Sequence, residues 1–235
     1  MRTLVITALE RAQLRPGGRL GWARNALGAV LGIALAGLVT QAVAQVTGHG
    51  LSPWLVAPLG ASAVLVFAVP ASPLAQPWSV FGGNLLSAAI GLLFGHMLGA
   101  AWLAAAVAVG VAIAAMTLAR CLHPPGGACA LLCALGAQTS HWGWDFLLLP
   151  LASNVALLVL AGSLWNNLTG HPWPHRPHLA PAMPLGTWAG TYAAEDLDAV
   201  LADWDEVLDV DRDDLDALFR EVEQRVLRRW QAKAR

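Results

Sequence analysis

The sequence predicts an all-α, polytopic membrane protein, because it is rich in apolar residues and its few charges are concentrated near the two ends. Of 235 residues, 57% are apolar and 12% are charged, and this is about half the charged fraction of a typical soluble domain. Between Arg24 and Glu195 the only charged residues are Arg120, Asp145 and Arg176. Three charges cannot keep the surface of a soluble fold of that length in water. The lipid bilayer is therefore the expected partner, and the net charge of −1 gives no reason to expect nucleic acid.

Six apolar segments, separated by connections rich in turn residues, are the predicted membrane helices. In chain order they cover residues 22–46, 54–69, 80–98, 102–119, 125–137 and 146–165. Tryptophans stand at several segment ends, for example Trp22, Trp54 and Trp102. An amphipathic ring prefers the headgroup level of a bilayer, so the pattern predicts up to six crossings.

The second and fifth segments are too short to cross a bilayer as straight helices. They would extend about 24 and 20 Å, against a hydrocarbon core of roughly 30 Å. If both segments enter the membrane and return, only four segments cross it. Either count leaves the two chain ends on the same side.

The same two segments share a sequence pattern. Residues 58–65 and 125–132 both read Pro-x-Gly-Ala-x-Ala-x-Leu and lie 67 residues apart. Because three crossings are an odd number, two sets of three are inverted relative to each other. Inverted repeats with short or broken segments at matching places are typical of secondary transporters, whose binding site lies where the breaks meet. Gly, Ala and Leu are abundant in this chain, so a chance match is the alternative.

The basic residues predict the orientation. Five arginines lie within the first 24 residues, before or at the start of the first segment, and the positive-inside rule places them in the cytoplasm. We expect a multi-pass protein of the cell inner membrane with both termini cytoplasmic. Its predicted parts are a basic N-terminus over residues 1–21, a transmembrane domain over 22–168, a linker rich in Pro and His over 169–193, and an acidic tail of amphipathic helices over 194–235.

The stretch His123-Pro124-Pro125-Gly126-Gly127 breaks the helical pattern between the fourth and fifth segments. Two prolines remove two backbone donors and disfavour a helical residue before each of them. The incoming helix is therefore predicted to stop near Cys121, and a new helix to run from Ala128 onward. We expect the first N–H groups of the new helix to lack intrahelical partners and to be accessible across the glycines. Such a break is costly in lipid unless it serves a function.

With this motif the chain resembles the HPP family of integral membrane proteins, which is named after the tripeptide at residues 123–125. The resemblance covers about residues 20–170, with further landmarks at residues 57–63, 72–77, 82–83 and 166–167. The chain departs from the family pattern at Gly126, where Ala is frequent, and at Asn84, where some members have His.

The resemblance implies an integral membrane protein, with nitrite transport known from plastid and cyanobacterial relatives. Many bacterial members continue into a pair of nucleotide-sensing CBS domains. The chain stops at Arg235, after a segment that resembles the linker before those domains, so we expect a member that lacks them.

A small monovalent anion needs a few aligned N–H donors, a positive potential and little steric obstruction, and a helix N-terminus offers all three. We therefore predict an anion site, for nitrite above all, where the two Pro-x-Gly-Ala helix starts face each other. The residues predicted to line it are His123, Pro124, Pro125, Gly126, Gly127, Ala128, Pro58, Gly60, Ala61, Ser62, Asn84 and Asn154. Arg120 is expected to raise the anion concentration at the cytoplasmic mouth.

Two kinds of site residue have a structural alternative. His123 either exchanges a proton near neutral pH or caps the carbonyls of the preceding helix. Asn84 and Asn154 lie inside predicted spans, where an amide must find a partner. They either bind the ligand or form hydrogen bonds between helices.

The sequence argues against an enzyme. It shows no Ser-His-Asp set, no membrane zinc motif and no pair of intramembrane acids, so there is little for catalysis to use. We expect no cofactor and no metal site, and we interpret the histidines of the linker as part of a Pro-rich connection.

The alternative function is a membrane-anchored regulatory or interaction module that recruits a partner through its tail. Apolar residues recur there at helical spacing in two runs, so two amphipathic helices are predicted. The oligomeric state stays open, and a homodimer is one candidate.

Overall fold

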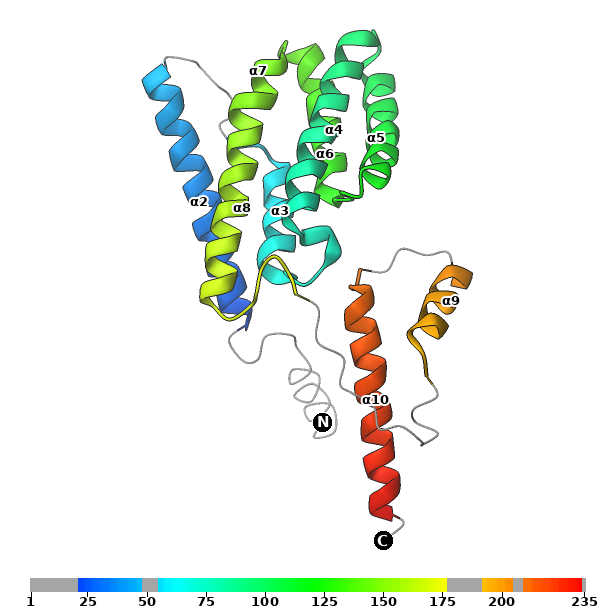
Figure 1. Ribbon diagram of the computed structural model, residues 1–235. Coiled ribbons are helices and arrows are strands. Elements are labelled where there is room, and N and C mark those ends of the chain that lie inside the picture. Colours follow the sequence, from blue (N-terminus) through cyan, green and yellow to red (C-terminus); the bar gives the residue numbers. More distant parts are fainter. Residues whose placement is uncertain (1–20, 48–54, 177–191, 205–208, 234–235) are drawn as a thin grey trace, which may run out of the picture. The chain divides into compact units, whose positions relative to one another are not determined.

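The computed structural model describes residues 21–47, 55–176, 192–204 and 209–233 (Figure 1). The described residues contain helices and no strand, so the all-α prediction is confirmed. They fall into two compact units. One comprises the residues up to Pro70 together with Leu74–Pro174, and the other comprises Ala71–Pro73 together with the tail from His175 onward. The basic N-terminus up to residue 20 and linker residues 177–191 lie outside the described residues.

The first unit contains a bundle of apolar helices. They are α2 (Gly21–Thr47), α3 (Pro58–Ala68), α4 (Pro77–Met97), α5 (Ala101–Leu118), α6 (Pro124–Thr139) and α8 (Ala152–Leu168). A 3-10 turn η1 (Pro73–Ala75) precedes α4, while the short α7 (Trp144–Phe146) and a π-helical turn η2 (Leu147–Leu151) lead into α8. Pro150 lies within η2, where a wider turn accommodates a residue that cannot donate a backbone hydrogen bond.

Four stretches of the described chain are long and apolar enough to cross a membrane. They are Gly21–Val46, Pro77–Met97, Ala101–Leu118 and Trp144–Leu168. Helices α3 and α6, with 11 and 16 residues, extend only about 17 and 24 Å at 1.5 Å per residue. They correspond to the predicted short second and fifth segments.

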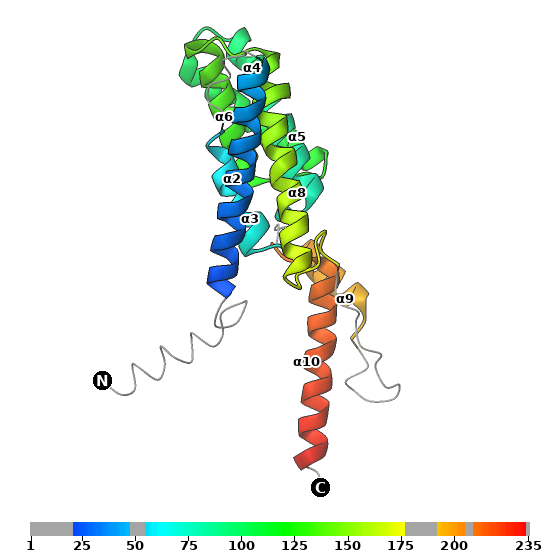
Figure 2. The same cartoon turned by 90° about the vertical axis from the view of Figure 1, so that its left-hand side faces the viewer.

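Helices α2, α3 and α8 form one side of the bundle (Figure 2). Helices α2 and α8 run antiparallel, since Arg24 bonds to Thr169 at one end (2.9 Å) and Asn154 bonds to Thr40 toward the other (2.8 Å). Helix α3 is also antiparallel to α2, with the Phe67 ring against Gly28 near the start of α2. The end of α3 therefore lies beside the start of α2.

Helices α4, α5 and α6 form the other side. Helices α4 and α6 run parallel, and their backbones are in contact. A Cβ atom on Gly91 would lie less than 3.0 Å from the Ala130 carbonyl oxygen, and a Cβ atom on Gly95 would lie within the same distance of the Ala134 carbonyl oxygen. Small residues allow such backbone contact between membrane helices. Helix α5 completes this group through a cluster of buried alanines.

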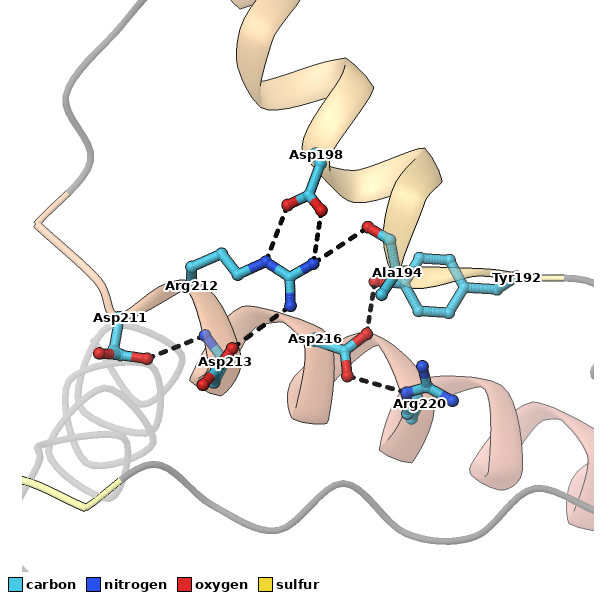
Figure 3. A network of polar contacts seen from close by, with 8 residues as sticks. All are labelled: Tyr192, Ala194, Asp198, Asp211, Arg212, Asp213, Asp216 and Arg220. Atoms are coloured by element: carbon cyan, nitrogen blue, oxygen red, sulfur yellow. Dashed lines mark hydrogen bonds and ion pairs between the residues drawn. The ribbon is translucent and has the colours of Figure 1, made fainter.

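The second unit contains α9 (Ala194–Trp204) and α10 (Arg212–Lys233). Arg212 joins the two helices through two hydrogen bonds of 2.8 and 2.7 Å to the Asp198 carboxylate (Figure 3). Asp216 accepts hydrogen bonds from the Tyr192 hydroxyl and from Arg220, both at 2.9 Å. The tail thus has the two predicted helices, linked by the ion pair between Arg212 and Asp198.

Candidate functional site

The second turn of α3 meets the residue that precedes α6. The Ser62 hydroxyl oxygen lies 2.8 Å from Nε2 of His123, and neither residue is exposed to solvent. From this contact α3 runs toward the start of α2 (Figure 1). Helix α6 runs the other way, to the end of α4, where Gln138 donates to the Leu98 carbonyl. The two short helices therefore begin side by side and run in opposite directions.

The His123 ring has a defined hydrogen-bonding role. Its Nδ1 atom lies 2.8 Å from the Leu74 carbonyl oxygen. Because a carbonyl only accepts, Nδ1 carries the hydrogen. In the neutral ring Nε2 is then an acceptor, and the Ser62 hydroxyl donates to it. The bond to Leu74 also departs from the predicted alternative, in which His123 caps the carbonyls of the preceding helix.

Asn84 extends this arrangement from α4. Its Nδ2 atom donates to the Ser62 hydroxyl at 3.1 Å and to the Val80 carbonyl at 2.8 Å, while its Oδ1 accepts from the Cys129 thiol at 3.0 Å. The Val80 carbonyl fixes the orientation of the amide, since it can accept only from the NH₂ group. A directed chain of hydrogen bonds therefore runs from Cys129 through Asn84, Ser62 and His123 to Leu74.

Several backbone donors at the two helix starts are bonded within the chain. In α3 the Leu59 and Gly60 N–H groups donate to the Val56 and Ala57 carbonyls at 3.0 and 3.1 Å. In α6 the Gly126 N–H donates to the His123 carbonyl at 2.8 Å. The preceding prolines have no N–H to offer.

This arrangement corrects two expectations. Helix α6 begins at Pro124 rather than Ala128, because proline is well suited to the first positions of a helix. Its first turn is also closed by the His123 carbonyl, so the expected unpartnered N–H groups are absent at Pro124, Pro125 and Gly126. The positive end of the helix dipole remains.

The glycines at the helix starts differ in the space around them. No atom lies within 4 Å of the position that a Cβ atom would take on Gly60 or Gly127. On Gly126 the same position lies 2.8 Å from the Gly83 carbonyl oxygen and from the Ser87 hydroxyl. Gly60 is exposed and Gly127 is half-buried, so the open space beside them lies at the surface of the unit, whereas Gly126 is buried and closely surrounded.

Ser87 is a buried polar residue that the sequence interpretation did not include. Its hydroxyl is fully buried and has no hydrogen-bond partner among the described residues. It lies three residues after Asn84, on the same face of α4. This spacing is the signal that could have identified it.

Two of the predicted site residues lie outside this hydrogen-bond chain. The amide of Asn154 donates to Thr40 in the interface between α8 and α2, as in the interhelical alternative. Arg120 follows α5 with a positive φ of 52° and is exposed, three residues before His123.

The end of α3 is held by polar side chains of α2 and α8. Arg24 donates to the Phe67 carbonyl at 3.1 Å, and Asn166 donates to the Val66 carbonyl at 2.9 Å. In the sequence interpretation Arg24 contributes only as one of the arginines that predict the orientation. Its contact with α3 depends on tertiary structure and has no local sequence signal.

Comparisons with known proteins agree with this architecture. A family model described as "HPP, transmembrane region" matches residues 16–174. Two curated transmembrane proteins of Dictyostelium discoideum are similar to this chain: one is 38% identical over 117 residues, or 48% of this chain and 41% of the relative. The other is 34% identical over 152 residues, or 63% of this chain and 47% of the relative. The matches thus span less than half the length of each relative, and no solved structure matches significantly.

Proposed function

Because this chain belongs to the HPP family of transmembrane proteins, we propose that it is a transporter or channel for a small monovalent anion, nitrite in the first place. The observation that carries the proposal is the 2.8 Å contact between Ser62 and His123. It brings together the starts of two short helices whose positive dipole ends favour an anion. Short or broken helices that meet inside a bundle are the usual setting of a transport site.

The proposed path passes the open side of the two helix starts. Space is free beside Gly60 and Gly127, and a small anion needs little more than such room next to a positive potential. The side chains of His123, Ser62 and Asn84 lie at the same level of the bundle and supply the polar groups. Arg120 adds positive charge near one mouth.

Proton uptake at His123 provides the coupling in this proposal. In the neutral state the Ser62 hydroxyl donates to Nε2, so it is not available to a ligand. When Nε2 takes up a proton, both ring nitrogens donate, and the Ser62 oxygen accepts from Nε2 instead. The Ser62 hydrogen is then free to point to an anion, beside a new positive charge. One proton and one anion would thus bind together.

The proposal includes the symmetry and orientation of the membrane domain. The segments α2–α4 and α5–α8 would be two inverted three-segment repeats, with α3 and α6 as the matching short members. Both chain ends would lie in the cytoplasm, in a protein of the inner membrane that forms a homodimer. Scanning the accessibility of introduced cysteines on both sides of the membrane tests this orientation.

Anion flux in proteoliposomes tests the function. We expect nitrite uptake above that of protein-free liposomes, which measure the passive flux of nitrous acid, and faster uptake when the outside is acidic. Nitrate, formate and chloride define the selectivity. His123→Ala and Gly127→Leu are expected to abolish uptake. Wild-type uptake in both variants would contradict the site, and no uptake of any of the four anions would contradict the function.

A second candidate function is a membrane-anchored interaction module that acts through the tail. The observation in its favour is that the tail, together with Ala71–Pro73, forms a unit separate from the helical bundle, in which an ion pair between Arg212 and Asp198 joins α9 and α10. Deletion of residues 195–235 separates the two functions. Transport should survive the deletion, whereas an interaction function should be lost.

A further inference from the structure

Helix α10 presents an apolar stripe on the face opposite its buried side. Leu218, Phe219, Val222 and Trp230 are 56%, 47%, 49% and 60% exposed. They recur at spacings of three, four and eight residues, so they lie on one side of the helix. The buried residues Ala217 and Leu227 lie on the other side. Helix α10 is therefore amphipathic beyond what its packing in the tail unit requires.

The charge of α10 changes sign along its length. Its first half, up to Glu223, carries five acids and two arginines, and its last ten residues carry four basic residues and no acid. The four basic residues are Arg225, Arg228, Arg229 and Lys233. Arg225 pairs with Glu221 across one turn at 2.6 Å, where both side chains are largely exposed. The end of the helix thus combines the exposed ring of Trp230 with a local positive charge, and the rest of the apolar stripe lies in the turns directly before it.

Helical spacing places part of this charge beside the stripe. Arg225 lies three residues after Val222, and Arg229 lies seven residues after it, so both stand on the same side of the helix as Val222. The exposed ring of Trp230 is next to Arg229. Cationic side chains that flank apolar and Trp side chains are the composition of helices that lie in the interface of an anionic bilayer.

A second copy of α10 fits this face poorly. A coiled-coil seam needs apolar residues at positions a and d of successive heptads. In the register that places the exposed residues Leu218 and Val222 in the seam, the next two positions are Arg225 and Arg229. Two copies would therefore bring like charges together in the seam, whereas an anionic surface would meet the same arginines with opposite charge.

We propose that residues 218–230 of α10 bind the anionic headgroups of a lipid bilayer, with Leu218, Val222 and Trp230 against the acyl boundary and Arg225, Arg228 and Arg229 at the phosphates. This inference does not depend on the transported substrate. It gives the tail a membrane-binding role that responds to lipid charge.

Hydrogen–deuterium exchange of the full-length protein in nanodiscs tests the proposal. Nanodiscs expose both membrane faces, so the result does not depend on the orientation of the chain. One sample contains phosphatidylcholine alone, and the other an equal mixture of phosphatidylcholine and phosphatidylglycerol. We expect the amides of residues 218–230 to exchange at least about fivefold more slowly in the anionic discs, and high salt to remove the difference.

Two triple variants separate charge from structure. Replacement of Arg225, Arg228 and Arg229 by Gln should remove the difference between the two lipids, whereas replacement by Lys should retain most of it. Equal exchange of the wild-type helix in both lipids would overturn the proposal. Slow exchange in both lipids, dependent on two copies per disc, would show self-association instead and would also overturn it. Neither result bears on anion flux, so the two proposals fail independently.

Discussion

The hydroxyl oxygen of Ser62 and the Nε2 atom of His123 are 2.8 Å apart, although 61 residues separate them in the chain. The bond joins the second turn of one short helix to the residue before the other. It also links a group that can take up a proton to a group that can turn its hydrogen. The first prediction follows from this link.

Ser62→Ala should impair both the stability of the fold and the flux of nitrite. The substitution leaves Nε2 of His123 and one hydrogen of the Asn84 amide without their buried partner. We expect the free energy of unfolding to fall by about 1–3 kcal/mol, measured by unfolding in detergent micelles, and nitrite uptake in proteoliposomes to be lost.

Asn154→Ala is the matched control for this prediction. It also removes a buried hydrogen bond, the one to Thr40, but outside the chain that contains His123. Stability should fall by a similar amount while nitrite uptake persists. Equal uptake by both variants would rule out a special role for Ser62.

Two neighbouring glycines should respond in opposite ways to added side chains. Gly126→Ala places a methyl group 2.8 Å from the Gly83 carbonyl oxygen, so we expect it to destabilise the protein by about 1–3 kcal/mol. Gly127→Ala meets no atom within 4 Å and should leave the unfolding transition unchanged or raise it slightly.

Flux measurements extend this comparison to the proposed path. A folded Gly127→Leu protein should transport no nitrite, because its larger side chain fills the open space. If Gly127→Leu folds and transports normally, the anion does not pass beside Gly127.

Arg24→Lys should loosen the attachment of α3 to its neighbours. The Arg24 guanidinium bonds to Thr169 on one side and to the Phe67 carbonyl on another, and an ammonium group cannot reproduce this fork. We expect the free energy of unfolding to fall by about 1–3 kcal/mol. Arg120→Lys, at an exposed position, should change it by less than about 0.5 kcal/mol. Similar losses in the two variants would mean that the hydrogen bonds of the Arg24 guanidinium add nothing beyond the general effect of an Arg→Lys substitution.

Tyr192 should titrate at unusually high pH. Burial and the hydrogen bond to Asp216 raise the pKa of Tyr192 from 10.0 to about 12. Because its folded-state pKa is raised, the group contributes stability that is fully present below pH 10 and is lost as the pH rises through about 12. The chain has one tyrosine, so the phenolate absorbance reports on this group alone.

Substitution of Asp216 tests the cause of the shift. Asp216→Asn should move the Tyr192 midpoint back toward 10, whereas Asp198→Asn should leave it nearly unchanged. A wild-type midpoint near 10 would mean that the bond to Asp216 does not persist in solution.

The sequence was sufficient to predict the short second and fifth helices but not the hydrogen bonds between them. Their lengths follow from apolar runs bounded by Pro and Gly, which are local signals. The partnership of Ser62 with His123 depends on how distant segments pack. Asn84 and Asn154 look alike in the sequence, because each is one amide within an apolar segment. Only the packing shows that the first bonds to Ser62 and the second to Thr40.

The start of α6 was predicted too late for a local reason. Inside a helix, proline interrupts the backbone hydrogen bonds, and the sequence prediction rests on this property. At the first two positions of a helix, however, the N–H groups have no intrahelical acceptor, so the missing N–H of proline removes no hydrogen bond. The same prolines explain why few free donors remain at this start. An anion site at this helix start therefore has to use the helix dipole and the polar side chains in addition to backbone N–H groups.

The glycine–alanine contact between α4 and α6 determines which helix can move. Backbones that touch along Gly91 and Gly95 leave no room for α6 to tilt without taking α4 with it. Helix α3 has no such contact, and its last carbonyls are held by Arg24 and Asn166. A movement of α3 about that held end would widen the gap between the two helix starts, and it would have to break the bond between Ser62 and His123.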